Sequence, residues 1–259
     1  MKAFDVHAHL YDKKFTDIDE VIKNAKKVLN GVLVAGEHPE SNRQVLALAK
    51  KYSNFCYASL GFHPTRIPDF SDKAIEAELK FIEKNANKIT AISETGLDYM
   101  WLKRELPKDR YEKEKVRQIT YFKKHILLSK QLDLPLVVHS RWSMKDVLGV
   151  LEVTKAKKVI LHAFEGTIDE AKKAVKLGYK ISIGNTINSS EMKQNVVKAI
   201  DLKYLVLETD SPVLAPVRGK RNEPANVKLT IKEIAKLKNV SEDHVVIASN
   251  KNIKDLFRI

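Results

Sequence analysis

Two histidines near the amino terminus, His7 and His9, have the spacing of a pair of metal ligands. They follow a short apolar stretch, residues 3–6, that we expect to form a buried strand. Residues two apart in a strand point the same way, so both imidazoles would leave its carboxyl end side by side. A His-x-His pair alone is a weak signal because it also arises by chance. A metal site therefore requires matching ligands from elsewhere in the chain.

Four more acids and histidines follow apolar stretches later in the sequence: Glu94, His139, His162 and Asp210. A buried parallel strand is expected to be apolar throughout, so core packing does not explain a histidine at its end. Four imidazoles and two carboxylates suit a divalent transition metal such as zinc or manganese, whereas magnesium prefers more oxygen. Six ligands exceed one tetrahedral site and fit two adjacent ions that share a carboxylate.

The elements that must bring these residues together alternate between strand and helix. Apolar stretches predict eight strands, at residues 3–6, 32–35, 56–60, 90–93, 136–139, 159–162, 180–184 and 204–208. Strict alternation implies parallel strands, and eight such units are the count of a closed (β/α)8 TIM barrel, an α/β fold. Its active sites lie at the carboxyl ends of the strands, where all six residues would meet. We expect one domain over residues 1–259.

An open doubly wound sheet is the alternative arrangement for such a pattern. Against it, no glycine-rich phosphate loop follows any predicted strand, and the polar residues are spread over many strand ends. The segment Met100–Arg110 shows no periodicity, so we expect a loop there, of a length that could cover a site. A long helix should begin near Tyr111, and short helices should fill residues 241–259.

Single residues of the remaining types give weaker signals. We expect His38, His125 and His244 to be surface residues and Cys56 to be a small core residue. One cysteine excludes an intramolecular disulfide, so a reducing cytoplasm is the expected compartment.

Composition limits the classes of partner. No apolar run approaches the roughly 20 residues that cross a bilayer, and no signal peptide precedes the first strand. The net charge of +13 favours an anionic partner such as nucleic acid. A lysine-rich solvated exterior, as in heat-adapted proteins, explains the same charge equally well.

Seven motifs occur in a fixed order along the chain: Asp5-Val-His-Ala-His9, Gly61-Phe-His-Pro64, Glu94-Thr-Gly-Leu-Asp-Tyr99, Val138-His-Ser-Arg141, His162-Ala-Phe-Glu-Gly166, Glu208-Thr-Asp-Ser-Pro212 and Arg218-Gly-Lys-Arg-Asn-Glu-Pro224. Together they resemble the TatD family of metal-dependent hydrolases, from Ala3 to about Pro224. Members of that family are TIM barrels, and several are metal-dependent deoxyribonucleases. The resemblance implies a hydrolase of phosphodiester bonds, a deoxyribonuclease that acts as a 3'-5' exonuclease on single-stranded DNA.

The resemblance also implies roles for individual residues. One ion would be held by His7, His9, Glu94 and Asp210, and a second by Glu94, His139 and His162. His63 would contact the scissile phosphate. We expect Asp210 to accept a proton from the attacking water and His63 to neutralise a phosphoryl oxygen, so the catalytic residues are Asp210, His63 and Glu94. The cofactors would be two divalent ions, Mg, Mn or Zn.

Residues around that centre are candidates for substrate binding. Arg141, Arg218 and Arg221 could hold the DNA backbone, although a solvated structural role explains them equally well. Tyr99 and Trp101 could stack on a base, with packing under the loop as the alternative. Glu223 could support a ligand histidine. We expect a protein without membrane contact that is a monomer or weak oligomer.

Two departures from the family pattern leave the substrate open. Glu165 stands where the family often has serine, and the segment 182–185 lacks the usual aromatic residue. A barrel hydrolase of the same superfamily acting on a small phosphoester, lactone or deaminase substrate is the main alternative. A catalytically silent nucleic-acid-binding protein is disfavoured, because acids and histidines gathered in one pocket are costly without a metal.

Overall fold

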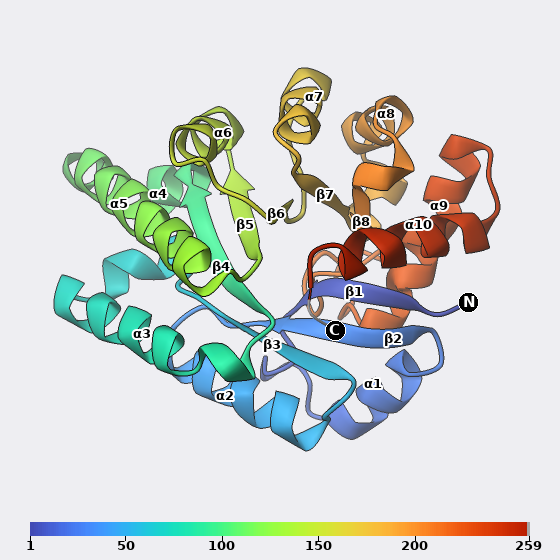
Figure 1. Ribbon diagram of the computed structural model, residues 1–259, viewed down its shortest axis with the longest axis horizontal. Helices are drawn as coiled ribbons and strands as arrows, with labels where there is room; N and C mark the ends of the chain where they lie inside the picture. Colours follow the sequence, from blue (N-terminus) through green and yellow to red (C-terminus); the bar gives the residue numbers. More distant parts are fainter. Residues whose placement is uncertain (258–259) are drawn as a thin grey trace.

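Eight strands form one parallel sheet in which each strand lies beside its sequence neighbours. The computed structural model describes residues 1–257. The strands are β1 (Ala3–Ala8), β2 (Leu29–Ala35), β3 (Cys56–Leu60), β4 (Ala91–Asp98), β5 (Leu136–Arg141), β6 (Val159–Leu161), β7 (Lys180–Ile183) and β8 (Leu205–Leu207). The predicted α/β (β/α)8 TIM barrel is confirmed, with the helices arranged outside the strands (Figure 1).

The barrel closes between β1 and the segment after β8. Ala8 pairs with Ser211 in a parallel bridge, and the backbone N–H of His9 donates to the Ser211 carbonyl at 2.7 Å. The backbone N–H of Asp210 donates to the His7 carbonyl at 2.9 Å. The first and last strands are therefore joined at the residues that carry the candidate ligands.

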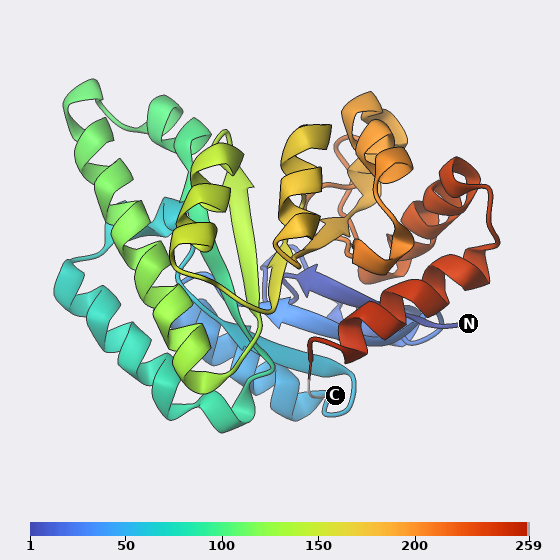
Figure 2. The same cartoon turned by 45° about the horizontal axis from the view of Figure 1, so that its top comes forward.

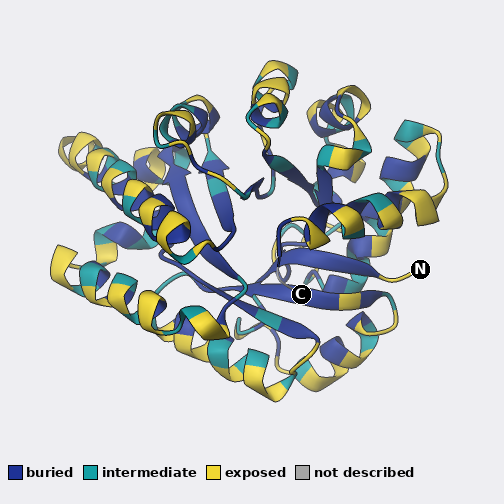
Figure 3. Ribbon diagram, viewed as in Figure 1, coloured by how far each residue is buried: buried dark blue, intermediate teal, exposed yellow. Residues whose placement is uncertain are grey.

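The helices cover the outside of the sheet. They are α1 (Ile18–Ala25), α2 (Pro39–Lys51), α3 (Asp72–Lys84), α4 (Tyr99–Glu105), α5 (Lys108–Leu132), α6 (Met144–Val153), α7 (Ile168–Lys176), α8 (Glu191–Ala199), α9 (Val227–Lys238) and α10 (Glu242–Lys254). Short 3-10 turns complete the connections: η1 (Pro64–Asp69), η2 (Ala86–Lys88), η3 (Asn185–Ser189), η4 (Leu202–Tyr204) and η5 (Pro224–Asn226). Each long helix has an exposed outer stripe and a buried inner stripe (Figure 3), as an amphipathic sequence requires.

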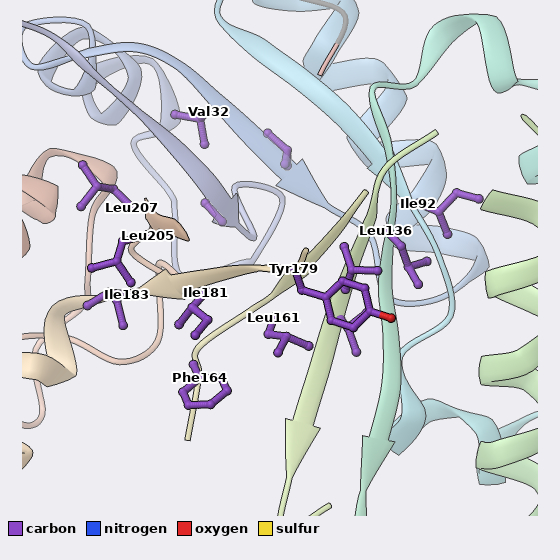
Figure 4. Close-up of a cluster of buried hydrophobic side chains, with 14 of the residues drawn as sticks. Val32, Ile92, Leu136, Leu161, Phe164, Tyr179, Ile181, Ile183, Leu205 and Leu207 are labelled. Carbon is purple, nitrogen blue, oxygen red and sulfur yellow. The ribbon is translucent and has the colours of Figure 1, made fainter. Parts of the chain in front are cut away.

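Alternating strand residues divide the core into two clusters. Val32, Leu136, Leu161, Leu205 and their neighbours pack under the helices (Figure 4). Residues one position away, such as Leu33, Val137, Ile160 and Val206, form a second cluster with Ile253, Leu256 and Phe257. Side chains alternate across a strand, so the second cluster fills the inside of the barrel. The end of α10, red in Figure 2, covers this cluster.

Two expected connections have a different structure. Residues 100–110 are not a loop, because α4 begins at Tyr99 and α5 already begins at Lys108. The Asp98 side chain caps α4 by accepting from the Trp101 N–H at 2.7 Å. The tail holds one helix, α10, instead of several short ones. Residues 258–259, part of that predicted tail, lie outside the described residues.

One surface prediction is also wrong. His125 is fully buried, on the inner face of α5, and its Nδ1 lies 2.7 Å from the Tyr121 carbonyl. His244 is exposed and Cys56 is buried, as predicted. Within residues 1–257, no helix combines the length and the apolar character needed to span a bilayer.

Candidate metal centre

A cavity of about 460 Å³ opens at the carboxyl ends of the strands. Its lining includes most of the residues selected from the sequence: His9, His63, Glu94, His139, Arg141, His162 and Asp210. His7 lies just beneath, fully buried. A larger cavity of about 580 Å³ near the amino-terminal ends of β1 and β3 is lined by Phe4, Tyr57 and part of α10, and none of its described lining residues is an acid or a histidine. The chemistry therefore belongs to the smaller cavity.

Glu94 lies at the centre of this cavity, with its two oxygens facing different histidines. Oε2 is 3.2 Å from His7 Nε2 and 3.4 Å from His9 Nε2. Oε1 is 3.0 Å from His139 Nδ1 and 3.6 Å from His162 Nε2. It is also 3.3 Å from His63 Nε2. One carboxylate thus separates the imidazoles into two groups.

Two glycines let neighbouring strands approach closely enough to place these ligands. A Cβ on Gly61 would lie 2.5 Å from the Ser93 backbone and 2.6 Å from the Glu94 backbone. A Cβ on Gly96, whose φ is +143°, would lie 2.0 Å from the His139 carbonyl oxygen. Only glycine fits at either position, so β3, β4 and β5 pack together at the point where Glu94 and His139 leave the strands.

Asp210 joins the first group of histidines from the opposite side. Its Oδ1 is 3.4 Å from His9 Nε2 and 3.8 Å from His7 Nε2. Its Oδ2 is 3.9 Å from His162 Nε2. Asp210 has a φ of +55°, a left-handed conformation that costs free energy for a residue other than glycine and is often found at functional sites.

Three histidines have one ring nitrogen fixed by a group outside the cluster. His9 Nδ1 lies 3.1 Å from the Ala35 carbonyl, His162 Nδ1 lies 2.8 Å from Glu208, and His139 Nε2 lies 2.9 Å from Asp98. A carbonyl or carboxylate oxygen accepts, so the fixed nitrogen must carry the proton. The other nitrogen of each ring faces Glu94; it is the nitrogen that would lose its proton and bind a cation.

His63 has the opposite arrangement. The backbone N–H of Thr65 donates to His63 Nδ1 at 3.2 Å, and the Thr65 hydroxyl lies 2.7 Å from the same nitrogen. Because Nδ1 accepts, neutral His63 carries its proton on Nε2, which points into the cavity. Neutral His63 therefore donates a hydrogen bond into the cavity. The other three rings instead turn toward Glu94 the nitrogen that can bind a cation.

The acids of the cluster create a strongly negative field. Burial alone would lower the pKa of His139, but hydrogen bonds to Asp98 and Glu94 outweigh burial and raise it to about 10. Burial would also lower the pKa of His9, yet Asp210 and Glu37 raise it to about 10. Burial would raise the pKa of Glu94, but His63 and His7 hold it well below its ordinary value. The cluster attracts cations.

Several buried atoms of the cluster fit a divalent cation. Glu94 Oε2 and Asp210 Oδ1 make no hydrogen bond within residues 1–257. His7 Nε2 and His9 Nε2 lie 3.2 Å apart. Ligand atoms lie within 4.8 Å of one another in the sets His7, Glu94 and His162, then His7, His9 and Asp210, then His63, Glu94 and His139, and finally His9, Glu37 and Glu94. This mixture of imidazole nitrogen and carboxylate oxygen suits a divalent transition metal.

Sequence reasoning assigned no role to three acids that support this centre. Asp98 and Glu208 hold His139 and His162, as described above. Glu37 follows β2 and accepts from the Tyr11 hydroxyl at 2.6 Å, beside His9. The rule that selected the ligands, reading the carboxyl end of each strand, would also have selected Glu37 if applied to the second strand.

The predicted substrate-binding arginines do not gather at one place. Arg141 lines the cavity, and Arg218 is exposed. The Arg221 guanidinium is paired with Asp17 at 2.5 Å and with Glu223 at 2.7 Å, so both Arg221 and Glu223 already have a partner.

The two predicted stacking residues have different surroundings. Trp101 lines the cavity. Tyr99 is buried, and its hydroxyl donates to Asp146 at 2.8 Å, so its ring serves packing.

Comparison with known proteins gives matches over nearly the whole chain. The chain matches the family model described as TatD related DNase over residues 4–258. It is 37% identical over 260 residues to an uncharacterized metal-dependent hydrolase of Methanocaldococcus jannaschii, covering 100% of this chain and 98% of that protein. It is 34% identical over 261 residues to deoxyribonuclease TATDN3 of Homo sapiens, covering 98% and 93%. The crystal structure of YJJV, a TatD homologue of Escherichia coli, superposes with a TM-score of 0.88 at 28% identity, covering 99% of this chain and 98% of that one.

Proposed function

Because the chain belongs to the TatD related DNase family of metal-dependent hydrolases, we propose that it is a deoxyribonuclease that uses two divalent ions to cleave single-stranded DNA from the 3' end. The deoxyribonuclease name of the human relative supports DNA as the substrate class. The net charge of +13 supports an anionic polymer.

The observation that carries the two-ion proposal is the position of Glu94. Its Oε2 faces His7 and His9, and its Oε1 faces His139 and His162. A carboxylate between two sets of nitrogen ligands is the arrangement expected of a ligand shared by two ions. We assign His7, His9, Glu94 and Asp210 to one ion and Glu94, His139 and His162 to the other. Mg, Mn or Zn would stabilise charge on a phosphoryl oxygen and supply a hydroxide nucleophile at neutral pH.

The protein's own groups supply the remaining chemistry. His63 Nε2 donates a hydrogen bond to a phosphoryl oxygen, because Thr65 fixes the proton on that nitrogen. The Asp210 carboxylate, through the oxygen that does not hold an ion, accepts the proton of the attacking water. Arg141, on the rim of the cavity, contacts an adjacent phosphate.

The direct test is nucleotide release from single-stranded DNA by the purified protein with Mg, Mn or Zn. A 3'-5' exonuclease releases a 3' label at once and shortens a 5'-labelled strand stepwise. Asp210→Asn should lower the rate at least about 100-fold, because it removes a proton acceptor and a ligand charge. The variant His244→Ala, an exposed histidine of α10, should retain the full rate.

The controls separate this function from the other candidates. Activity that persists with chelator, or that Asp210→Asn retains, would contradict a metal-dependent site at these residues. Metal binding with hydrolysis of a small phosphoester or lactone, but none of DNA, would replace DNA by a small-molecule substrate. We also expect a monomer or weak oligomer located in the cytoplasm, which light scattering and cell fractionation would check.

A further inference from the structure

A second cavity adjoins the metal cavity at the carboxyl end of β5. It has a volume of about 380 Å³ and is bordered by Trp142, Tyr99 and Met144. Ser140 and Glu165 line both cavities, so the two are neighbours. The side cavity therefore lies within reach of a molecule bound at the metal centre.

Trp142 is placed where packing does not require it. It directly follows Arg141, the last residue of β5, and 61% of it is exposed. Its φ is +55°, a conformation that is rare and unfavourable for a bulky side chain. A large exposed ring held in an unfavourable conformation beside a catalytic cavity indicates a binding role.

Positive charge lies over this ring, at the outer limit of cation–π distance. Lys103 Nζ and Arg104 Cζ of α4 each lie 5.9 Å from the Trp142 ring centroid. Arg141 precedes the ring in the chain and lines the metal cavity. An aromatic face flanked by cations is how proteins hold a nucleotide without strict sequence preference.

Two of the three acids of the side cavity already have partners. Asp146 accepts from the Tyr99 hydroxyl at 2.8 Å and lies 3.8 Å from Lys115 Nζ. Glu170 accepts from the Thr167 N–H at 2.7 Å. Glu165 is exposed and makes no hydrogen bond or ion pair within residues 1–257, although its charge acts on Lys193. It can therefore accept a hydrogen bond at the junction of the two cavities.

We propose that the side cavity is a nucleobase subsite, in which an unpaired base next to the scissile phosphodiester stacks on Trp142 and donates an N–H to Glu165. Lys103 and Arg104 hold the flanking phosphate. This inference rests on the proposed nuclease function. It would favour single strands, because a paired base must first break its pairing before it can stack on the ring, which costs free energy. It also gives a role to Glu165, since carboxylates accept from base amines such as that of cytosine.

The test compares Trp142→Ala and Trp142→Phe with the wild type on end-labelled single-stranded DNA and on the same strand with abasic sites at its 3' end, which has no base to stack there. We expect Trp142→Ala to raise KM for DNA roughly tenfold with little change in kcat, as loss of one stacked base implies. Trp142→Phe should recover most of the affinity. On the abasic strand, the KM of the wild type should be as high as that of Trp142→Ala. Val153→Ala, which shortens an exposed side chain of α6, is the matched control.

The outcomes separate this subsite from the nuclease function itself. If the wild type fails to cleave DNA with any of the three metals, the nuclease function fails. If the wild type cleaves DNA and Trp142→Ala has an unchanged KM, the base subsite alone is wrong. An equal loss on DNA and on the abasic strand would also overturn the subsite, because it would mean that Trp142 acts without contacting a base.

Discussion

Glu208 controls a candidate ligand although it does not line the cavity. Its Oε2 lies 2.8 Å from His162 Nδ1, and its Oε1 accepts from the Ala163 N–H at 2.8 Å. The carboxylate therefore fixes both the ring and the turn that carries it. It also helps to raise the pKa of His162 to about 9, against the effect of burial, which would lower it. Groups in this position usually decide which ring nitrogen is free to bind a metal.

Glu208→Gln should lower metal affinity about 10- to 100-fold without unfolding the protein. The glutamine oxygen can still accept from Ala163, but its NH2 group would face His162 Nδ1. That contact favours the tautomer with the proton on Nε2, the nitrogen that faces Glu94. Calorimetric titration with zinc or manganese measures the change. Glu152→Gln, on the exposed face of α6, is the matched control, and equal affinities for both variants would mean that His162 does not bind metal.

The sequence predicted the position of the site residues better than their supporting partners. Each selected ligand follows an apolar stretch, and the barrel brings all strand ends together. The order of apolar stretches and polar residues in the sequence was therefore sufficient to predict which side chains meet. Asp98 and Glu208 lie within motifs of acids and apolar residues, where a sequence shows no difference between a ligand and a residue that orients one. The sequence did not identify Trp142 as a binding residue either, because its exposure and backbone conformation are properties of the folded chain.

At the scale of elements, His125 shows how a helix face can be misjudged. Phe122 and Ile126 were correctly placed on the buried face of α5, and His125 lies between them on the same face. Its residue type suggested the surface, whereas its spacing indicated the core. Burial lowers the pKa of His125 to about 4, so the ring is neutral at neutral pH.

This burial predicts a pH dependence of stability. The pKa of His125 in the folded protein, about 4, lies below its ordinary value of 6.5, so the unfolded chain binds the proton more readily. The free energy of unfolding should therefore be unaffected by this group above about pH 6.5 and fall as the pH decreases toward 4, by about 3 kcal/mol. His125→Phe should lack this share of the loss. Urea unfolding of both proteins at several pH values measures the difference, and parallel curves would show that His125 is not responsible.

Element boundaries were predictable where a buried face repeats over several turns. The segment 100–110 was missed because α4 has only seven residues and the first turn of α5 is exposed, so neither shows a periodic apolar face. The tail was divided in error because Ser249 and Asn252, which are polar, lie on the buried face of α10. Polar residues in a buried stripe conceal its period from the sequence.

At the scale of the molecule, the net charge of +13 leads us to expect that DNA binding weakens as the salt concentration rises. If Arg141, Lys103 and Arg104 each neutralise one phosphate, KM for single-stranded DNA should rise with about the second power of the salt concentration. The double variant Lys103→Ala with Arg104→Ala should reduce that exponent by about 1.4. Steady-state rates over a range of potassium chloride concentrations measure it. The double variant Lys80→Ala with Lys84→Ala, at exposed positions of α3, should leave the exponent unchanged. An equal decrease in this variant would mean that DNA binds to the positive surface in general and not along Arg141, Lys103 and Arg104.

The metal centre should also couple ligand binding to the stability of the whole barrel. His7 and Asp210 lie where β1 meets the segment after β8, so a cation bound there joins the two ends of the sheet. A ligand that binds only the folded state at 100 times its Kd stabilises it by about 2.7 kcal/mol, which corresponds to roughly 5–10 °C in Tm for a protein of this size. Zinc or manganese should raise Tm by this amount, and chelator should reverse the change.

Glu94→Gln distinguishes metal-linked stability from a general effect of the ions. The substitution removes a buried carboxylate whose pKa the surrounding imidazoles hold well below its ordinary value, so the metal-free variant should be less stable than the metal-free wild type. It should also lose most of the Tm increase on adding metal, because both groups of histidines lose their shared carboxylate. Thermal unfolding followed by circular dichroism, with His244→Ala as control, measures both quantities. A full Tm increase in Glu94→Gln would place the stabilising ion elsewhere on the protein.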